Sequence, residues 1–207
     1  IAHRGASGHA PENTLAAYRK ALELGAIAAE TDVFLSSDKR VVAIHDETLE
    51  RTTNGSGRVD ETSYDELRTF DAGSWFNPRF SDERLPELGE LLDLIDKQMI
   101  LCIEIKSGDG IEAAIRDILD ARDARPNVVF FSFNPEKVKL TKELMPDVPS
   151  LYLVHVSEPP YEYAADLVDQ AVNLGADALG ISGRGLPSVN IDEAHAAGLP
   201  VFVYTIN

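Results

Sequence analysis

Two short patterns of charged residues lie in apolar, strand-like parts of the sequence. Glu30-Thr31-Asp32 places two acids at positions i and i+2, and Glu104-Ile105-Lys106 places an acid and an amine at the same spacing. Residues i and i+2 of a β-strand project from the same face, so each pair points into one space. Three carboxylates at strand ends repel one another unless a cation lies between them, and oxygen ligands suit a hard ion. We therefore expect one divalent cation, Mg²⁺ or Ca²⁺, at Glu30, Asp32 and Glu104; the alternative is that each acid pairs with a nearby Arg or Lys.

Two histidines and an arginine end other strand-like segments. His3-Arg4-Gly5 follows the first apolar residues, and His45-Asp46 closes a later apolar run. Histidine transfers protons near neutral pH, and the fork of an arginine matches a phosphate or a carboxylate. A single histidine at a strand end is more often a structural hydrogen-bonding residue. Two of them, together with acids, Arg4 and Lys106 at other strand ends, indicate a reactive site.

The overall charge is strongly acidic. Asp and Glu outnumber Lys and Arg by 35 to 19, which gives a net charge of −16. This balance excludes non-specific binding to nucleic acid and docking on anionic membranes. If the ligand is an anion, Arg4 and Lys106 are the local cations that can bind it despite this net charge. The single cysteine, Cys102, excludes an internal disulfide or a thiolate metal cluster.

The apolar pattern alternates strand-like and helix-like segments over 207 residues. This order predicts an α/β fold with a parallel sheet, either doubly wound or closed as a (β/α) barrel. The predicted strands are Ile1–His3, Ile27–Leu35, Val41–His45, Met99–Ile105, Val128–Phe133, Ser150–Val154, Ala178–Ile181 and Val201–Ile206. The predicted helices run from about Leu15 to Leu24 and over Leu88–Ile95, Ile111–Ala121, Pro135–Leu144, Ala164–Leu174 and Ile191–Ala197.

Two segments depart from this alternation. Val41–His45 follows Leu35 after five polar residues, which is too short for a crossover helix, so we expect an antiparallel hairpin return. Residues 46–84 contain turn signals such as Asn54-Gly55, scattered aromatic residues and little periodicity. Because so long a loop is unusual in a compact domain, we expect a small inserted subdomain there.

These residues resemble the glycerophosphodiester phosphodiesterase family. The resemblance extends from Ile1 to Asn207, and its motifs occur in the family's order and approximate spacing, which makes the set far more specific than any one motif. The motifs are His3-Arg4-Gly5, Pro11-Glu12-Asn13-Thr14, Glu30-x-Asp32, His45-Asp46, Leu49-x-Arg51-Thr52-Thr53-Asn54-Gly55-x-Gly57, Gly73-Ser74-Trp75-Phe76, Glu104-x-Lys106 and Ser132-Phe133. One position differs: the family's usual Pro-Thr-Leu reads Pro86-Glu87-Leu88, which should affect the start of a helix and not the chemistry.

The resemblance implies a TIM (β/α)₈ barrel, with residues 1–207 as a single catalytic domain and 46–84 as a small subdomain inserted after the strand-2 hairpin. In the family, the residues that match Glu30, Asp32 and Glu104 bind a divalent metal. Those that match His3 and His45 are the acid–base pair, and those that match Arg4 and Lys106 hold the phosphate. The implied reaction is metal-dependent hydrolysis of a glycerophosphodiester to sn-glycerol 3-phosphate and an alcohol.

Several points stay open at this stage. The roles of the two histidines are not assigned by the sequence, although His45 is favoured as the acid. The head group, the choice between Mg²⁺ and Ca²⁺ and the oligomeric state are also undetermined.

Without the hairpin return there are seven barrel strands, so we expect an eighth strand and its helix after Asn207, about 25–40 residues, and a few residues before Ile1. No signal peptide or membrane span is predicted, so the default expectation is a cytoplasmic protein.

Two other functions also fit part of this pattern. A glycosidase would use Glu30 and Glu104 as its carboxylate pair, but it would leave the histidines, Arg4 and Lys106 without a role and would need no metal. A non-catalytic barrel would bind phosphodiesters or phospholipid head groups. The intact pair His3 and His45 argues against it, since a protein that had lost activity would be free to lose either histidine.

Overall fold

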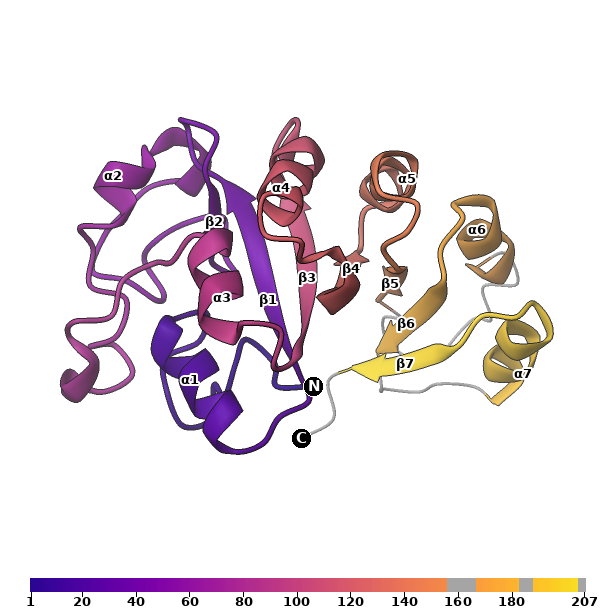
Figure 1. The fold of residues 1–207 in the computed structure, drawn as a ribbon, viewed down its shortest axis with the longest axis horizontal. Helices are drawn as coiled ribbons and strands as arrows, with labels where there is room; N and C mark the ends of the chain where they lie inside the picture. Colours follow the sequence, from indigo (N-terminus) through magenta and orange to yellow (C-terminus); the bar gives the residue numbers. More distant parts are fainter. Residues whose placement is uncertain (156–166, 183–187, 205–207) are drawn as a thin grey trace. The chain divides into compact units, whose positions relative to one another are not determined.

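The chain forms two compact units of strands and helices in a computed structural model (Figure 1). The first unit is Ile1–Val128 and the second is Val129–Asn207, and each is described by itself. The structure describes residues 1–155, 167–182 and 188–204. In both units the strands and helices alternate along the chain, as the apolar pattern predicts.

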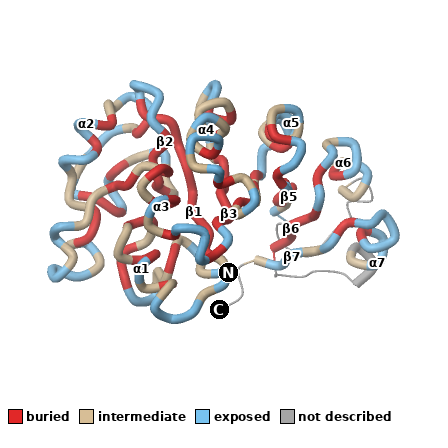
Figure 2. The backbone as a smooth tube through the Cα atoms, in the orientation of Figure 1, coloured by how far each residue is buried: buried red, intermediate tan, exposed pale blue. Residues whose placement is uncertain are grey.

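The sheet of the first unit has the strand order β2-β1-β3. The central strand β1 (Ala28–Leu35) pairs in parallel with β3 (Ile100–Ser107) and antiparallel with β2 (Val41–Ala43). The predicted hairpin return is therefore confirmed. Because β1 has a neighbour on each side, its residues are buried almost throughout, and Figure 2 shows this as a continuous red strand.

Three helices of the first unit fit the predicted positions closely: α1 (Leu15–Glu23), α3 (Leu88–Ile95) and α4 (Ile111–Asp120). Helix α3 repeats leucine and isoleucine at helical spacing, and these side chains are buried against the neighbouring elements. Its first turn contains the position where the sequence departs from the family. There the backbone N–H of Glu87 donates to Glu90 Oε2 at 3.0 Å, so the helix still begins at Leu88.

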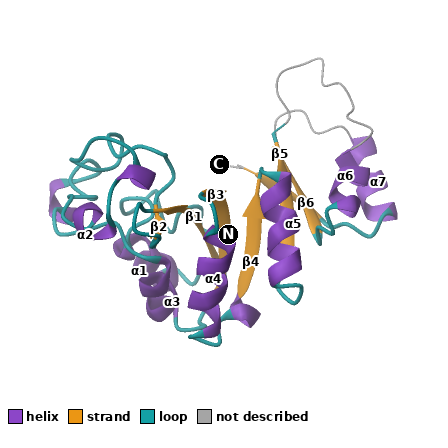
Figure 3. Cartoon of the chain, turned by 90° about the horizontal axis from the view of Figure 1, so that it is seen from above, coloured by secondary structure: helices purple, strands orange, loops and turns teal. Residues whose placement is uncertain are grey.

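The second unit has the parallel strand order β4-β5-β6-β7. Its helices follow the strands in turn, with α5 lying against β5 (Figure 3). Helix α7 begins three residues before the predicted start. Residues 164–166 of the helix predicted over Ala164–Leu174 and residues 205–206 of the last predicted strand lie outside the described residues. The elements are β4 (Val128–Ser132), α5 (Pro135–Leu144), β5 (Ser150–Val154), α6 (Leu167–Asn173), β6 (Ala178–Ser182), α7 (Ser188–Ala196) and β7 (Val201–Tyr204).

The strand predicted over Ile1–His3 is confirmed only at Ala2, which pairs with β1 without forming a regular strand. Ala2 makes a single parallel bridge to Ala29, with its N–H donating to Ala28 and its carbonyl accepting from Glu30. The chain then turns at once, because Arg4 and Gly5 both have positive φ, 58° and 76°. A strand cannot continue through two residues in the left-handed region.

Residues 46–84 contain three short helices, η1 (Val59–Glu61), α2 (Tyr64–Leu67) and η2 (Pro78–Phe80). Phe76 contacts both Trp75 and Phe80 edge to face, but the buried side chains of the segment pack with those of the adjacent hairpin. That cluster consists of Phe34, Val42, Ile44, Leu49, Val59, Tyr64, Leu67, Ala72 and Leu85. The assignment of 1–207 to one domain, with 46–84 as a subdomain inside it, stays a prediction.

Helix α1 takes its N-terminal partner from the far end of this segment. The Thr14 hydroxyl donates to the Pro11 carbonyl and does not cap the helix. Glu83 Oε2 instead accepts from the N–H of Ala16 at 3.1 Å, which satisfies one of the free donors of the first turn. The segment 46–84 is thereby tied to α1, which directly follows the turn formed by residues 3–14.

That turn depends on a close contact at Gly5. A Cβ atom there would lie 2.7 Å from Ala17 Cβ and 2.8 Å from the Ala17 carbonyl carbon. Gly25 has the same φ of 76°, but nothing lies within 4 Å of its added Cβ. Gly25→Ala is therefore a matched control that carries the backbone strain without the clash.

We expect Gly5→Ala to lower the free energy of unfolding by about 2–5 kcal/mol, and Gly25→Ala by about 1–2 kcal/mol. The first value adds overpacking against α1 to the cost of the left-handed backbone. Urea unfolding of the two variants measures the difference. Equal losses would mean that the contact between Gly5 and Ala17 relaxes without cost.

Candidate functional site

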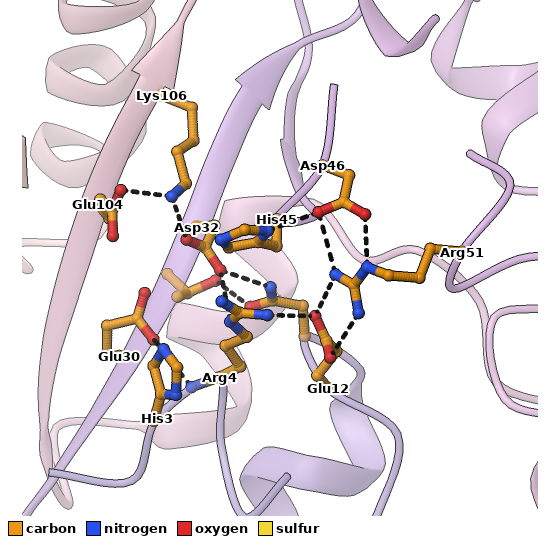
Figure 4. A network of polar contacts seen from close by, with 12 residues as sticks. His3, Arg4, Glu12, Glu30, Asp32, His45, Asp46, Arg51, Glu104 and Lys106 are labelled. Atoms are coloured by element: carbon orange, nitrogen blue, oxygen red, sulfur yellow. Dashed lines mark hydrogen bonds and ion pairs between the residues drawn. The ribbon is translucent and has the colours of Figure 1, made fainter. Parts of the chain in front are cut away.

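Three acids meet where β1 and β3 lie side by side. Glu30 and Asp32 alternate along β1 and share a face, and the parallel register places Asp32 opposite Glu104 on β3. One carboxylate oxygen from each acid lies within 4.8 Å of the others, and all three residues are buried (Figure 4). The structure therefore brings together the three residues predicted to bind a metal.

The three carboxylates of this triad carry more negative charge than the neighbouring positive groups neutralise. Burial, followed by the charges of Asp32 and Glu104, raises the pKa of Glu30 well above its usual range. Burial also raises the pKa of Glu104. Glu30 Oε1 is buried without a hydrogen-bond partner. Clustered carboxylates with an unsatisfied buried oxygen fit a hard divalent cation.

Lys106 supplies one positive charge to the triad. Its ammonium contacts Glu104 and lies 3.0 Å from Asp32 Oδ1. Burial by itself would lower the pKa of Lys106, but the charges of Asp32 and Glu104 outweigh it, so the pKa lies above its usual value. Lys106 is therefore an ammonium group at neutral pH.

Arg4 lies on the other side of the triad. Its backbone N–H donates to Glu30 Oε2 at 2.8 Å, and its Nη1 donates to Glu12 Oε1 at 2.8 Å. Arg4 Nε lies 3.4 Å from Asp32 Oδ2, buried and without a hydrogen bond. One guanidinium donor is therefore left for an anion beside the carboxylates.

The two histidines sit in different surroundings. His3 Nε2 lies 3.9 Å from Glu30 Oε2, and burial together with the charge of Arg4 lowers the pKa of His3. A lowered pKa keeps this imidazole neutral at pH 7. His45 is half-buried, and its Nδ1 lies 2.6 Å from Asp46 Oδ1.

Asn13 belongs to the motif Pro11–Thr14, but the sequence predicts no role for it at the site. It adopts the left-handed conformation with φ 55°, and its amide donates to Asp32 Oδ2 at 2.9 Å. Its carbonyl oxygen accepts from Thr31 Oγ1 at 3.1 Å and from the hydroxyl of Tyr18 at 3.0 Å. Asn13 is nearly fully buried, so these contacts hold Asp32 in one orientation.

Three more charged residues belong to the site without having been assigned a role: Glu12, Asp46 and Arg51. They form ion pairs that connect Arg4 with His45. The sequence signal that could have identified them is their presence in the motif segments Pro11–Thr14 and 45–57.

All seven predicted site residues lie in the first unit: His3, Arg4, Glu30, Asp32, His45, Glu104 and Lys106. No helix within the described part of the chain is long and apolar enough to cross a membrane.

Comparison with known proteins places this site in a family. Residues 3–207 match the model of the glycerophosphoryl diester phosphodiesterase family. A glycerophosphodiester phosphodiesterase of Bacillus subtilis (strain 168) is 31% identical over an alignment of 227 positions, which covers 100% of this chain and 76% of that protein.

Two solved structures support the same conclusion. One is a phosphodiesterase from Oleispira antarctica in complex with the product sn-glycerol-3-phosphate, with a TM-score of 0.87 and 33% identity over 99% of this chain and 83% of that chain. The other is a glycerophosphodiester phosphodiesterase from Agrobacterium tumefaciens strain C58, with a TM-score of 0.83 and 32% identity over 99% of this chain and 85% of that chain.

These matches confirm the predicted fold class, an α/β fold of the TIM-barrel type, and the predicted family. The match covers the turn that carries His3 and Arg4, both strands of the acidic triad and the segment that carries His45. The chain therefore belongs to the glycerophosphoryl diester phosphodiesterase family, whose members are phosphoric diester hydrolases.

Proposed function

We propose that this enzyme hydrolyses glycerophosphodiesters to sn-glycerol 3-phosphate and an alcohol, with His3 and His45 as its acid–base pair. The observation that supports this most directly is that two histidines from separate segments share one site with the acidic triad, Arg4 and Lys106. The N–H of Ile44 donates to the carbonyl of Asp32 at 3.0 Å, which places the following residue, His45, beside the triad (Figure 4). The bound product of the Oleispira antarctica relative agrees with the proposed product.

One divalent cation, Mg²⁺ or Ca²⁺, is proposed for the acidic triad. Glu30, Asp32 and Glu104 would hold it, and the unpartnered Oε1 of Glu30 gives a ready ligand atom. Such a cation neutralises phosphate oxygens and makes the phosphorus more open to attack. Asn13 contributes to this proposed metal site indirectly, because its hydrogen bond orients the Asp32 carboxylate.

The positive side chains beside the triad are proposed to bind the phosphate. Arg4 offers its Nε, which is buried without a hydrogen bond, and Lys106 offers an ammonium held by Asp32 and Glu104. Both lie within the first unit, close to the carboxylates. They supply the local positive charge that an anionic substrate needs in a protein of net charge −16.

The surroundings of the histidines suggest a division of roles. His3 has a lowered pKa, so at neutral pH its imidazole is free to take the proton of the attacking hydroxyl. His45 hydrogen-bonds through Nδ1 to Asp46, a carboxylate that holds the ring in one orientation with Nε2 on the opposite side. We propose His3 as the base and His45 as the acid that protonates the leaving alkoxide.

Turnover of glycerophosphocholine tests this function. We expect release of sn-glycerol 3-phosphate, loss of turnover with EDTA, and recovery with Mg²⁺ or Ca²⁺. A panel with choline, ethanolamine, glycerol and inositol head groups, run against both cations, measures specificity. Binding without turnover under every condition would favour a non-catalytic head-group protein, and cleavage of a glycoside that is insensitive to EDTA would favour the carboxylate-pair glycosidase.

A further inference from the structure

A line of alternating charges connects His45 to Arg4 (Figure 4). Asp46 contacts His45 Nδ1 at 2.6 Å, and its two oxygens accept from Arg51 Nε at 2.5 Å and Arg51 Nη2 at 3.1 Å. Arg51 also donates to both oxygens of Glu12, from Nη1 at 3.0 Å and from Nη2 at 2.8 Å. Glu12 Oε1 accepts in turn from Arg4 Nη1 at 2.8 Å.

This line of contacts determines which ring nitrogen of His45 carries a proton. The hydrogen bonds from Arg51, with a smaller contribution from His45, lower the pKa of Asp46 to about 2. At neutral pH Asp46 is therefore a carboxylate, which can only accept hydrogen bonds. His45 Nδ1 must then be the donor, which leaves Nε2 facing away from Asp46 for exchange of a proton with the substrate.

Glu12 is ionised in the same way on the other side of Arg51. Burial by itself would raise the pKa of Glu12, but the hydrogen bond from Arg51 and the charge of Arg4 outweigh it and lower the pKa. Glu12 is therefore a carboxylate placed between two guanidinium groups. It fixes the Arg4 side chain while leaving the Nε of Arg4 without a hydrogen bond.

Only the shape of arginine allows this bridge. Four of its five N–H donors are in use, two toward Asp46 and two toward Glu12. The planar guanidinium therefore sets the two carboxylates at a fixed distance and angle. A lysine carries the same charge at a single nitrogen and cannot reproduce two forks on adjacent edges of one plane.

The backbone that carries Arg51 is itself well anchored. Leu49 is fully buried in the cluster shared with β1 and β2. The Leu49 carbonyl accepts from both the N–H and the hydroxyl of Thr53, at 3.1 Å and 2.7 Å. Although the Arg51 side chain is 44% exposed, it starts from a backbone with little freedom.

We propose that Arg51 is a positioning residue, which holds His45 through Asp46 and Arg4 through Glu12 so that the proton donor and the phosphate-binding group keep one relative geometry. The proposal rests on the proposed function, in which His45 and Arg4 act on the substrate. It also gives the inserted segment 46–84 a purpose in the reaction, since that segment supplies Arg51.

The test compares Arg51→Met and Arg51→Lys with Arg58→Met. Arg58 is a matched control, because it lies in the same segment, is similarly exposed and pairs with two acids, Glu47 and Asp60. We expect both Arg51 variants to lose roughly 10- to 100-fold in kcat/KM for glycerophosphocholine, since small misplacements of reacting groups have effects of this size. Part of the loss should be in kcat, through His45, and part in KM, through Arg4.

A spectroscopic readout separates this proposal from the proposed function. In the wild type we expect a slowly exchanging, downfield ¹H resonance from the Nδ1–H of His45, assigned by comparison with His45→Ala. It should disappear in both Arg51 variants and persist in Arg58→Met. Absence of turnover in the wild type would contradict the proposed function, while this signal would still report on Arg51.

Two results would overturn the proposal. One is an Nδ1–H signal that persists in both Arg51 variants. The other is wild-type kcat and KM in Arg51→Lys, because the positive charge without the fork would then be sufficient. Thermal unfolding of each variant checks that it is folded, and Arg51→Lys, which keeps the charge, remains informative if Arg51→Met does not fold.

Discussion

Replacing His3 or His45 by alanine is expected to lower kcat for a glycerophosphodiester by roughly 10²- to 10⁴-fold, the usual contribution of general acid–base catalysis. The two residues act in one step, so the double variant should be little slower than either single variant. Steady-state kinetics under saturating Mg²⁺ or Ca²⁺ measures the effect. His195→Ala is the control, because His195 is exposed on α7 in the second unit.

The pH dependence of kcat/KM distinguishes the two roles. Burial and the charge of Arg4 lower the pKa of His3, so the rate should fall on the acid side only below pH 6.5, where His3 becomes protonated and can no longer accept a proton. The wild-type profile should be bell-shaped, and His3→Ala should lose the acid limb. A variant that keeps the full rate across the pH range would show that its histidine is structural.

Replacing Glu30 by glutamine is expected to abolish cation binding and to lower activity at least about 100-fold, since the metal would lose a carboxylate ligand. Glu30 is the most informative position, because its Oε1 has no hydrogen-bond partner while Glu104 is paired with Lys106. Added Mg²⁺ or Ca²⁺ should raise the Tm of the wild type and leave that of Glu30→Gln unchanged.

The same substitution should raise the Tm of the cation-free protein. Burial and the charges of Asp32 and Glu104 raise the pKa of Glu30 in the folded state above its unfolded value. The folded protein then binds more protons than the unfolded chain, so its stability falls as the pH rises from the unfolded pKa through the folded pKa. Glutamine has no charge to bury, which removes this loss at neutral pH.

Glu47→Gln is the control for both measurements, because Glu47 is exposed and pairs with Arg58 away from the triad. Glu104→Gln should also lose cation binding, with a smaller gain in the stability of the cation-free protein, since it removes a partner of Lys106. Near-wild-type turnover of either triad variant under saturating cation would remove that residue from the site.

The local patterns of the sequence were sufficient to place most of the strands and helices and to show which charged side chains share a strand face. Glu30 and Asp32 share a face because successive side chains of a strand point to opposite faces, so that residues i and i+2 lie on the same one. Helix α3 lies where its leucines repeat at helical spacing, and five polar residues after Leu35 allowed only a hairpin return. These properties depend on neighbours along the chain, so periodicity alone determines them.

The tertiary structure determined which residues contact and orient these groups. Glu12 meets Arg51 across 39 positions, Asn13 meets Asp32 across 19, and α1 takes a partner for its first turn from Glu83, which is 67 positions from Ala16. Such contacts depend on which distant segments the fold brings together, and the periodicity of the local sequence does not predict them. For the same reason the sequence patterns did not predict that the chain turns at Gly5 to pack against Ala17. The types of reactive group were thus determined by the sequence, while the partners that orient each of them were determined by the fold.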